Sequence, residues 1–203
     1  MPLSRTLCVL AATAALGGCA AMNSLSSDVS SHGQWTADRR APMSFVFERL
    51  PSQQEQPERQ ALLEEAARPA LEAAGFRPAT DPATADYSVE LGARVSGDDR
   101  VYLTEGFGPW GWHGFYRRSR FGLGLGHGPY WGSGWTTPVY EREVLVLIRD
   151  RRSGRTVYET RATNQGTSSG IQALLPAMFE AALKDFPSAG LNPRRVVTQI
   201  DKR

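Results

Sequence analysis

Residues 86–96, DYSVELGARVS, carry the pattern that decides the fold. Apolar or aromatic side chains alternate with polar or small ones along the whole stretch. The apolar set is Tyr87, Val89, Leu91, Ala93 and Val95. An alternation with a period of two predicts a β-strand with one buried face and one wet face, which is typical of antiparallel sheets.

Three further segments are predicted to be strands. Residues 43–49 (MSFVFER) form a short apolar stretch, and residues 139–150 are richest in apolar side chains near their middle. The sequence from Asp150 to Gly154 (DRRSG) predicts a hairpin turn that leads into a strand over residues 155–165.

Two segments have the apolar spacing of helices. The first is residues 58–74, where Pro57 suits the first turn and Gly75 the C-terminal stop. Because a proline in a helix interior removes a hydrogen bond and costs ~3 kcal/mol, Pro69 predicts a kink or break.

The second helix is predicted within residues 171–186, with Pro176 in its first turn and Pro187 at its end. The order is strand, helix, strand, insertion, strand, strand, helix. It predicts an α+β domain, a small antiparallel or mixed four-stranded sheet with two helices packed on one face. We expect this single domain over residues 42–187 and a C-terminal tail over residues 188–203.

Residues 1–18 have the layout of a secretory signal peptide. A short basic start precedes an apolar run that is too short for a membrane span, which needs roughly 20 residues. The run ends in Leu16, Gly17, Gly18 and Cys19, which resembles the bacterial lipobox, a motif whose cysteine is acylated and becomes the new N-terminus. A plain secretory signal that ends near a cysteine is the alternative.

The lipobox resemblance implies a membrane partner through a lipid on Cys19. Several acyl chains, at about 0.8 kcal/mol per buried methylene, give lasting attachment. Ala20 stands where an aspartate would signal inner-membrane retention, so the resemblance implies an outer-membrane lipoprotein that faces the periplasm. Residues 19–41, rich in small polar side chains after the cysteine, are predicted to be a flexible tether.

Composition narrows the chemistry of the mature chain. Cys8 leaves with the signal and Cys19 takes the lipid, so no cysteine remains for a disulfide, a thiolate metal site or a nucleophile. The net charge of +2 gives no bulk attraction to nucleic acid, and we expect no nucleic-acid partner. The sequence leaves the oligomeric state open.

No catalytic residue, metal site or cofactor is predicted. Residues 166–170 (GTSSG) match the G-x-S-x-G motif of hydrolases, which requires a histidine later in the chain, and all three histidines precede it. We expect instead a loop whose Ser168 or Ser169 caps the last helix. His113 and His127 alone do not complete a metal site. Scattered carboxylates leave an envelope hydrolase as the catalytic alternative.

Residues 106–135, GFGPWGWHGFYRRSRFGLGLGHGPYWGSGW, form an insertion between the second and third predicted strands. This much glycine is costly to fix in a regular element, whereas Trp, Tyr and Arg dominate binding hot spots. The candidate binding residues are Trp110, Trp112, Tyr116, Arg117, Arg118, Arg120, Tyr130, Trp131 and Trp135. An envelope protein, lipopolysaccharide or a peptidoglycan glycan could be the partner, and a tolerated low-complexity loop is the alternative.

The elements in order resemble a known family. They are the lipobox, SFVFERLP, a helix ending in LEAAGF, ADYSVEL, the Gly/Trp/Tyr-rich insertion, VLVLIRDRRSGRTVYE and a helix ending in ALKDFP. Together they are similar to the bacterial lipoprotein family called domain of unknown function 4136, over residues 44–187. Tyr158 stands where the family usually has a tryptophan.

The family resemblance implies a periplasm-facing lipoprotein of undefined activity, and it supplies no catalytic residues. The element order is also similar to that of the lipopolysaccharide-assembly lipoprotein that plugs an outer-membrane barrel. An assembly partner of an outer-membrane complex is therefore the alternative function. This second likeness concerns the fold only.

Overall fold

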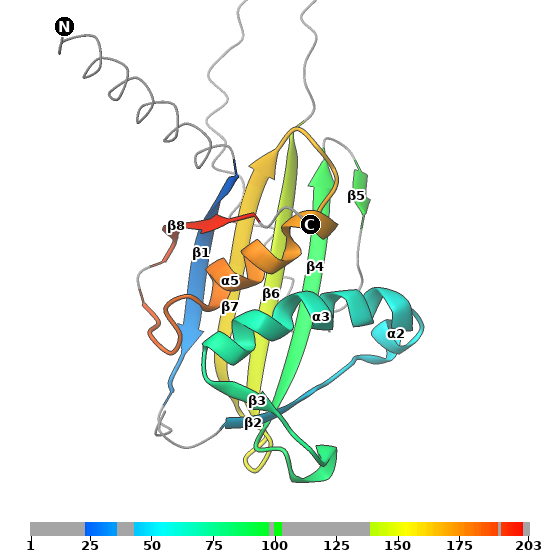
Figure 1. The fold of residues 1–203 in the computed structure, drawn as a ribbon, viewed down its shortest axis with the longest axis vertical. Coiled ribbons are helices and arrows are strands. Elements are labelled where there is room, and N and C mark those ends of the chain that lie inside the picture. Colours follow the sequence, from blue (N-terminus) through cyan, green and yellow to red (C-terminus); the bar gives the residue numbers. More distant parts are fainter. Residues whose placement is uncertain (1–22, 36–42, 98–99, 103–138, 191, 201–203) are drawn as a thin grey trace, which may run out of the picture.

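The computed structural model describes residues 23–35, 43–97, 100–102, 139–190 and 192–200. These residues build one curved mixed sheet of eight strands, in the order β3-β2-β4-β6-β7-β1-β8 with β5 paired to β4 (Figure 1). The strands are β1 (Ser24–Gly33), β2 (Met43–Phe47), β3 (Phe76–Pro78), β4 (Tyr87–Gly97), β5 (Arg100–Tyr102), β6 (Tyr140–Asp150), β7 (Thr156–Gly166) and β8 (Arg194–Gln199).

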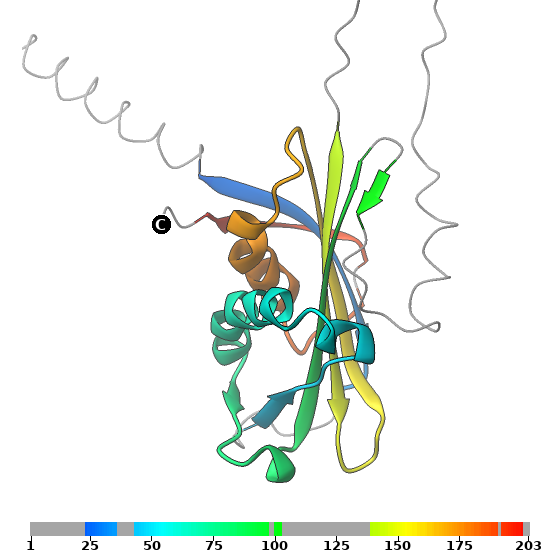
Figure 2. The same ribbon diagram turned by 90° about the vertical axis from the view of Figure 1, so that its right-hand side faces the viewer.

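The helices α3 (Pro57–Ala73) and α5 (Leu175–Leu183) lie on one side of this sheet (Figure 2). The other helical elements are the short α2 (Pro51–Gln54) and the 3-10 turns η1 (Pro82–Thr84) and η2 (Gln172–Leu174). α3 and α5 cover what we call the inner face of the sheet, and the opposite side is the outer face.

The prediction of a four-stranded sheet with two helices is wrong. β1 lies inside the stretch predicted to be a tether, and β8 lies inside the predicted tail. The sequence hid β1 because two of its inward positions are the buried serines Ser27 and Ser31, which break the apolar alternation. Ser31 Oγ lies 3.2 Å from Thr160 Oγ1, so a hydrogen bond replaces apolar contact there.

The central antiparallel strands were predicted correctly. β4, β6 and β7 pair antiparallel, and the turn between β6 and β7 is the predicted one. Ser153 N–H donates to Asp150 Oδ1 over 2.7 Å, and Gly154 takes a φ of 69°, which favours glycine. β2 pairs parallel with both β3 and β4, which makes the sheet mixed.

α3 runs without interruption through Pro69, so the predicted break is absent. Pro69 cannot donate to the carbonyl of Glu65 one turn earlier, and both residues are exposed. Water can satisfy that carbonyl, which lowers the cost of the proline. Pro176 does stand in the first turn of α5, as predicted.

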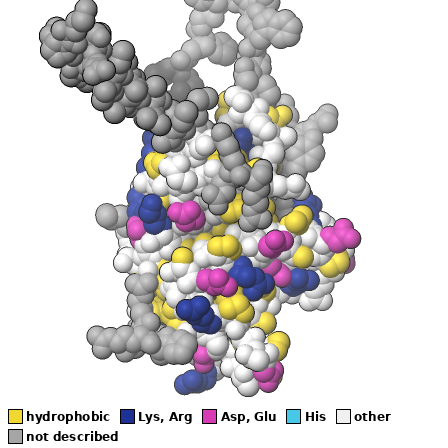
Figure 3. All heavy atoms as spheres, viewed as in Figure 1, with side chains coloured by type: hydrophobic (Ala, Val, Ile, Leu, Met, Phe, Trp, Pro, Cys, Tyr) yellow, Lys and Arg dark blue, Asp and Glu magenta, His cyan; other side chains and the backbone are white. Residues whose placement is uncertain are grey.

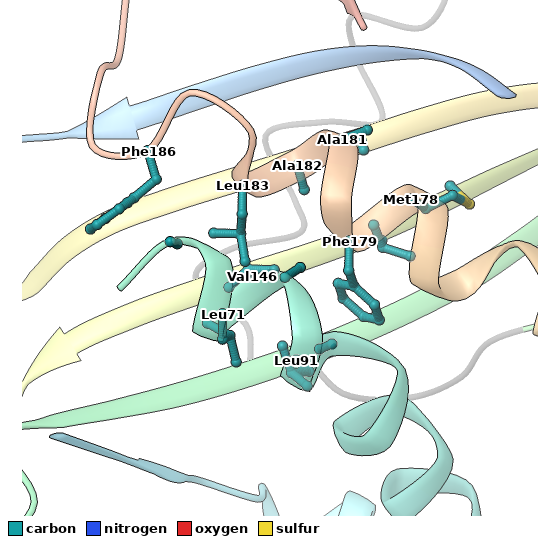
Figure 4. Close-up of a cluster of buried hydrophobic side chains, with 14 of the residues drawn as sticks. Leu71, Leu91, Val146, Met178, Phe179, Ala181, Ala182, Leu183 and Phe186 are labelled. Carbon is teal, nitrogen blue, oxygen red and sulfur yellow. The ribbon is translucent and has the colours of Figure 1, made fainter. Parts of the chain in front are cut away.

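The core lies between α5, α3 and the inner face (Figure 4). Phe179 and Met178 of α5 are fully buried, and they share the cluster with Leu71 of α3, Leu91 of β4 and Val146 of β6. Toward the lower end in Figure 1 the core becomes aromatic, with ring contacts among Trp35, Phe76, Tyr87, Tyr158 and Phe186. Tyr158 is fully buried and serves as the predicted aromatic anchor.

Candidate functional site

The predicted site residues lie outside the described part of the chain. The lipobox (residues 16–19) falls within residues 1–22, and all the candidate binding residues of the insertion fall within residues 103–138. The structure does fix where the insertion attaches. It leaves the sheet after Tyr102 of β5 and returns at Val139, just before β6.

An ion pair is buried on the outer face. Arg94 of β4 stands opposite Glu143 of β6, and Nη2 of Arg94 lies 2.5 Å from Glu143 Oε2. Glu143 is 2% exposed and Arg94 8%. Burial raises the pKa of Glu143, and the charge of Arg94 opposes that rise only in part. Among the described residues, Glu143 Oε1 accepts no hydrogen bond.

A second charged cluster lies lower on the same face. Arg149 Nη1 lies 3.0 Å from Glu90 Oε2 and 3.3 Å from Glu48 Oε2, and Ser88 donates its hydroxyl to Glu48 over 2.7 Å. The Arg149–Glu90 contact is an ion pair without hydrogen-bond geometry. Burial raises the pKa of Glu90, with Arg149 acting against it.

Sequence reasoning assigned these side chains to a wet face, and that assignment is wrong. Ser88, Glu90 and Arg94 are all buried. The ion pair could have been predicted by aligning β4 and β6 antiparallel, because this alignment places Arg94 opposite the carboxylate of Glu143. An alternation pattern alone does not show which charges will neutralise one another.

A cavity of about 470 Å³ opens beside the second cluster, lined by Val46, Phe47, Glu48, Ser88, Arg149, Asp150, Arg151 and Gly154. Most of its charged side chains already make hydrogen bonds or ion pairs within the protein. Arg151 Nη1 donates to the carbonyls of Pro82 and Ala85 at 2.7 and 3.1 Å, and Arg149 holds Glu48. Within the described ranges, no group of three or more His, Cys, Asp or Glu side chains is placed to hold a metal.

The upper end of the sheet in Figure 1 is where β1 and β6 begin and where β4 and β7 end. The buried guanidinium of Arg142 donates to the carbonyl of Ser168 at 2.6 Å and to Asn164 Oδ1 at 2.7 Å. Asn164 in turn donates to the carbonyl of Ser26 at 2.8 Å. These contacts connect the start of β1 to the start of β6 and the end of β7.

Ser168 belongs to this upper-end network, and its hydroxyl accepts from Gly170 N–H at 3.1 Å. The predicted helix cap is absent, since Leu174 occupies the N-cap of α5 and Ile171 that of η2, both without a side-chain hydrogen bond. The G-x-S-x-G letters therefore describe a turn that precedes η2.

The family model described as domain of unknown function DUF4136 matches residues 28–188. The chain belongs to this family. The match begins within β1, earlier than the resemblance seen in the sequence, so the family domain contains most of β1.

Several solved structures are similar to this DUF4136 domain. A PDZ domain protein from Parabacteroides distasonis gives a TM-score of 0.50 at 12% identity and covers 86% of this chain and 39% of that chain. PelC dodecamers from Paraburkholderia phytofirmans in two crystal forms give TM-scores of 0.39 and 0.42 at 14% identity, covering 77% of this chain and 94% of that chain. The likeness to the PDZ domain protein concerns the fold alone, and the TM-scores of the PelC dodecamers are too low to support a conclusion about this chain. A comparison with curated proteins finds no match.

The helix side of the DUF4136 domain carries a small groove between α3 and α5. Its volume is about 170 Å³, and Leu62, Glu65, Ala66, Pro69, Gln172, Leu175 and Pro176 line it. Figure 3 shows apolar and charged side chains mixed over these helices. Leu62, one of the apolar residues with helical spacing in the predicted helix of residues 58–74, is 50% exposed at the rim of this groove.

Proposed function

We propose that this DUF4136 protein is an outer-membrane lipoprotein, acylated at Cys19 and facing the periplasm. The lipobox at residues 16–19 and the signal-like segment before it support this placement. In the described part of the chain, no helix combines the length and apolarity that a bilayer span requires.

The domain would act as a non-catalytic binding module through the insertion of residues 106–135. The observation that carries this proposal is the composition of that segment, which is dense in Trp, Tyr and Arg and holds no carboxylate. Rings of this kind stack on other rings and on sugar faces, and arginine binds phosphate in a two-pronged geometry. The segment is attached to a sheet whose eight described strands all lie outside it.

The test is photo-crosslinking in intact cells with a photoreactive residue in place of Trp112. The matched control carries the same residue in place of Arg152, an exposed position in the hairpin between β6 and β7. Capture of a discrete protein from position 112 would identify an assembly or tethering factor. Capture of lipopolysaccharide or peptidoglycan fragments would identify an envelope-surface binder. Equal capture at both positions would refute binding by the insertion.

A second variant separates binding from folding. Deletion of residues 106–135 is expected to leave the melting temperature nearly unchanged, because the eight strands and the helices lie outside this segment. A large fall in melting temperature would show that the insertion belongs to the core.

A further inference from the structure

The chain is held in the fold from residue 23 onward. The carbonyl of Asn23 accepts a hydrogen bond from Ile200 N–H at 2.6 Å, and β1 then pairs with β8 from Ser24 to Val29. The Asn164 side chain holds the carbonyl of Ser26 from the other side. The first residues of β1 are thus a fixed part of the upper end.

Cys19 lies four residues before Asn23. A residue extends a chain by at most about 3.3–3.6 Å, so the acylated cysteine can be no more than about 14 Å from Asn23. The long tether expected from the sequence would have let the domain rotate freely far from the membrane. The link of four residues between Cys19 and Asn23 is too short to allow that rotation.

We infer that the upper end of the sheet is the surface that faces the lipid bilayer. The inference rests on the proposed acylation of Cys19, because the lipid supplies the fixed point from which the distance is counted. The occupant of this surface is the headgroup region of the leaflet that holds the anchor.

The chemistry of the upper end fits that occupant. Its described segments are residues 23–26, 96–97, 100, 139–142, 164–171 and 196–200, and their charged residues are Arg100, which pairs with Gly97, Glu141 and the buried Arg142. Among the described large apolar side chains, two of the three that are exposed are here, Val139 at 57% and Val197 at 53%. A sparsely charged, partly apolar surface meets lipid phosphates with little repulsion or desolvation.

The lower end differs in charge and lies far away. Arg77, Asp81, Asp86, Asp150, Arg151, Arg152 and Arg155 gather there, around β3, η1 and the β6–β7 hairpin. β4 has 11 residues and runs from the lower end to the upper end. At about 3.3 Å per residue, the lower end is about 35 Å farther from the anchor.

Single-cysteine labelling tests this orientation. Acylation consumes the thiol of Cys19, so Ser169→Cys at the upper end and Arg152→Cys at the lower end each carry a lone thiol, and both positions are exposed. Each acylated variant is labelled with an environment-sensitive fluorophore and placed in phosphatidylethanolamine–phosphatidylglycerol vesicles that contain a headgroup-linked quencher. The label at position 169 should lose most of its emission, and the label at position 152 should keep the emission that it has in quencher-free vesicles.

Equal quenching of acylated protein at both positions, or stronger quenching at position 152, would overturn the orientation. A linker of about 20 Gly and Ser residues inserted before Asn23 is the control, since such a coil spans about 25 Å and lets the domain tumble. It should bring the two labels to similar quenching, and a persistent difference would show that the short link does not set the orientation.

Mass spectrometry of Cys19 separates the two claims. A chain without acyl groups would overturn the proposed function and the orientation together. Acylated protein with equal quenching would overturn the orientation alone.

Discussion

The two faces of the sheet are buried by different means. On the inner face, side chains such as Leu91 and Val146 are removed from water by α3 and α5, and the hydrophobic effect drives that burial. On the outer face, Glu143 and Arg94 are almost as inaccessible, yet each charge must be compensated by the other. Substitutions at equally buried positions should therefore destabilise the fold for different reasons. On the inner face they remove packing, and on the outer face they leave a charge without its partner.

The largest effect is expected on the inner face. Phe179→Ala should lower the free energy of unfolding by roughly 3–5 kcal/mol, because the ring is fully buried and the backbone of α5 cannot collapse into the space. Chemical denaturation measures the change. Leu62→Ala on the exposed rim of α3 is the control and should stay within about 0.5 kcal/mol. Similar losses for both variants would show that α5 is not packed as described.

Breaking the outer ion pair should be nearly as costly. Arg94→Met leaves Glu143 buried without its main partner and should cost about 3 kcal/mol, the low end for such pairs because the charge of Arg161 also favours the carboxylate. The double variant Arg94→Met with Glu143→Leu removes both charges and should recover most of the loss. A double-mutant cycle checks this, and simple addition of two losses would contradict the pairing.

The pH dependence of the free energy of unfolding should reflect the buried Glu143 of the outer face. Burial raises the folded-state pKa of Glu143 above its ordinary value of 4.5, so its contribution to stability is fully present below that value and is lost as the pH rises through the folded-state pKa. The stability difference between the protein and Glu143→Gln should shift against the protein as the pH rises from about 4 to about 8. Denaturation across that range measures it, and a trend in the other direction would refute the raised pKa.

The smallest effect is expected in the hairpin, which belongs to neither face. Asp150→Ala removes the acceptor of the Ser153 N–H and should cost about 1 kcal/mol. The hydrogen bond from that backbone group lowers the pKa of Asp150 from its ordinary 3.8, so this stability is present above that value and is lost as the pH falls through the folded-state pKa. Thermal melts at neutral and acidic pH follow it, and a cost that grows in acid would contradict the assignment.

Periodicity predicted the elements whose burial is apolar. β4, β6, α3 and α5 were found because most of their inward positions are apolar or aromatic at regular spacing, and β7 was found through the DRRSG turn that precedes it. β1 was missed because serines fill two of its inward positions, and β8 because only Val196 and Val197 stand out among polar neighbours.

For the candidate site, the sequence predicted residue types and motifs but not which side chains meet in the fold. The lipobox and the insertion are sequence motifs in residues outside the described part, so they remain predictions. The buried charges of the outer face and the Arg142 network at the upper end depend on pairings across distant strands. Such pairings arise from the register of the sheet, which local spacing does not specify.

The position of β1 sets the order in which the chain can fold. β1 is made early, yet its partners are β7 and β8, and the Asp28–Arg195 ion pair joins positions 167 residues apart. Until β7 is made, β1 has unpaired backbone groups along both edges, and its second edge stays unpaired until β8 closes a still longer loop. Sheets dominated by such contacts fold slowly and offer open edges to other chains meanwhile. The two edges of β1 are therefore both protected from other chains only when β8 is in place.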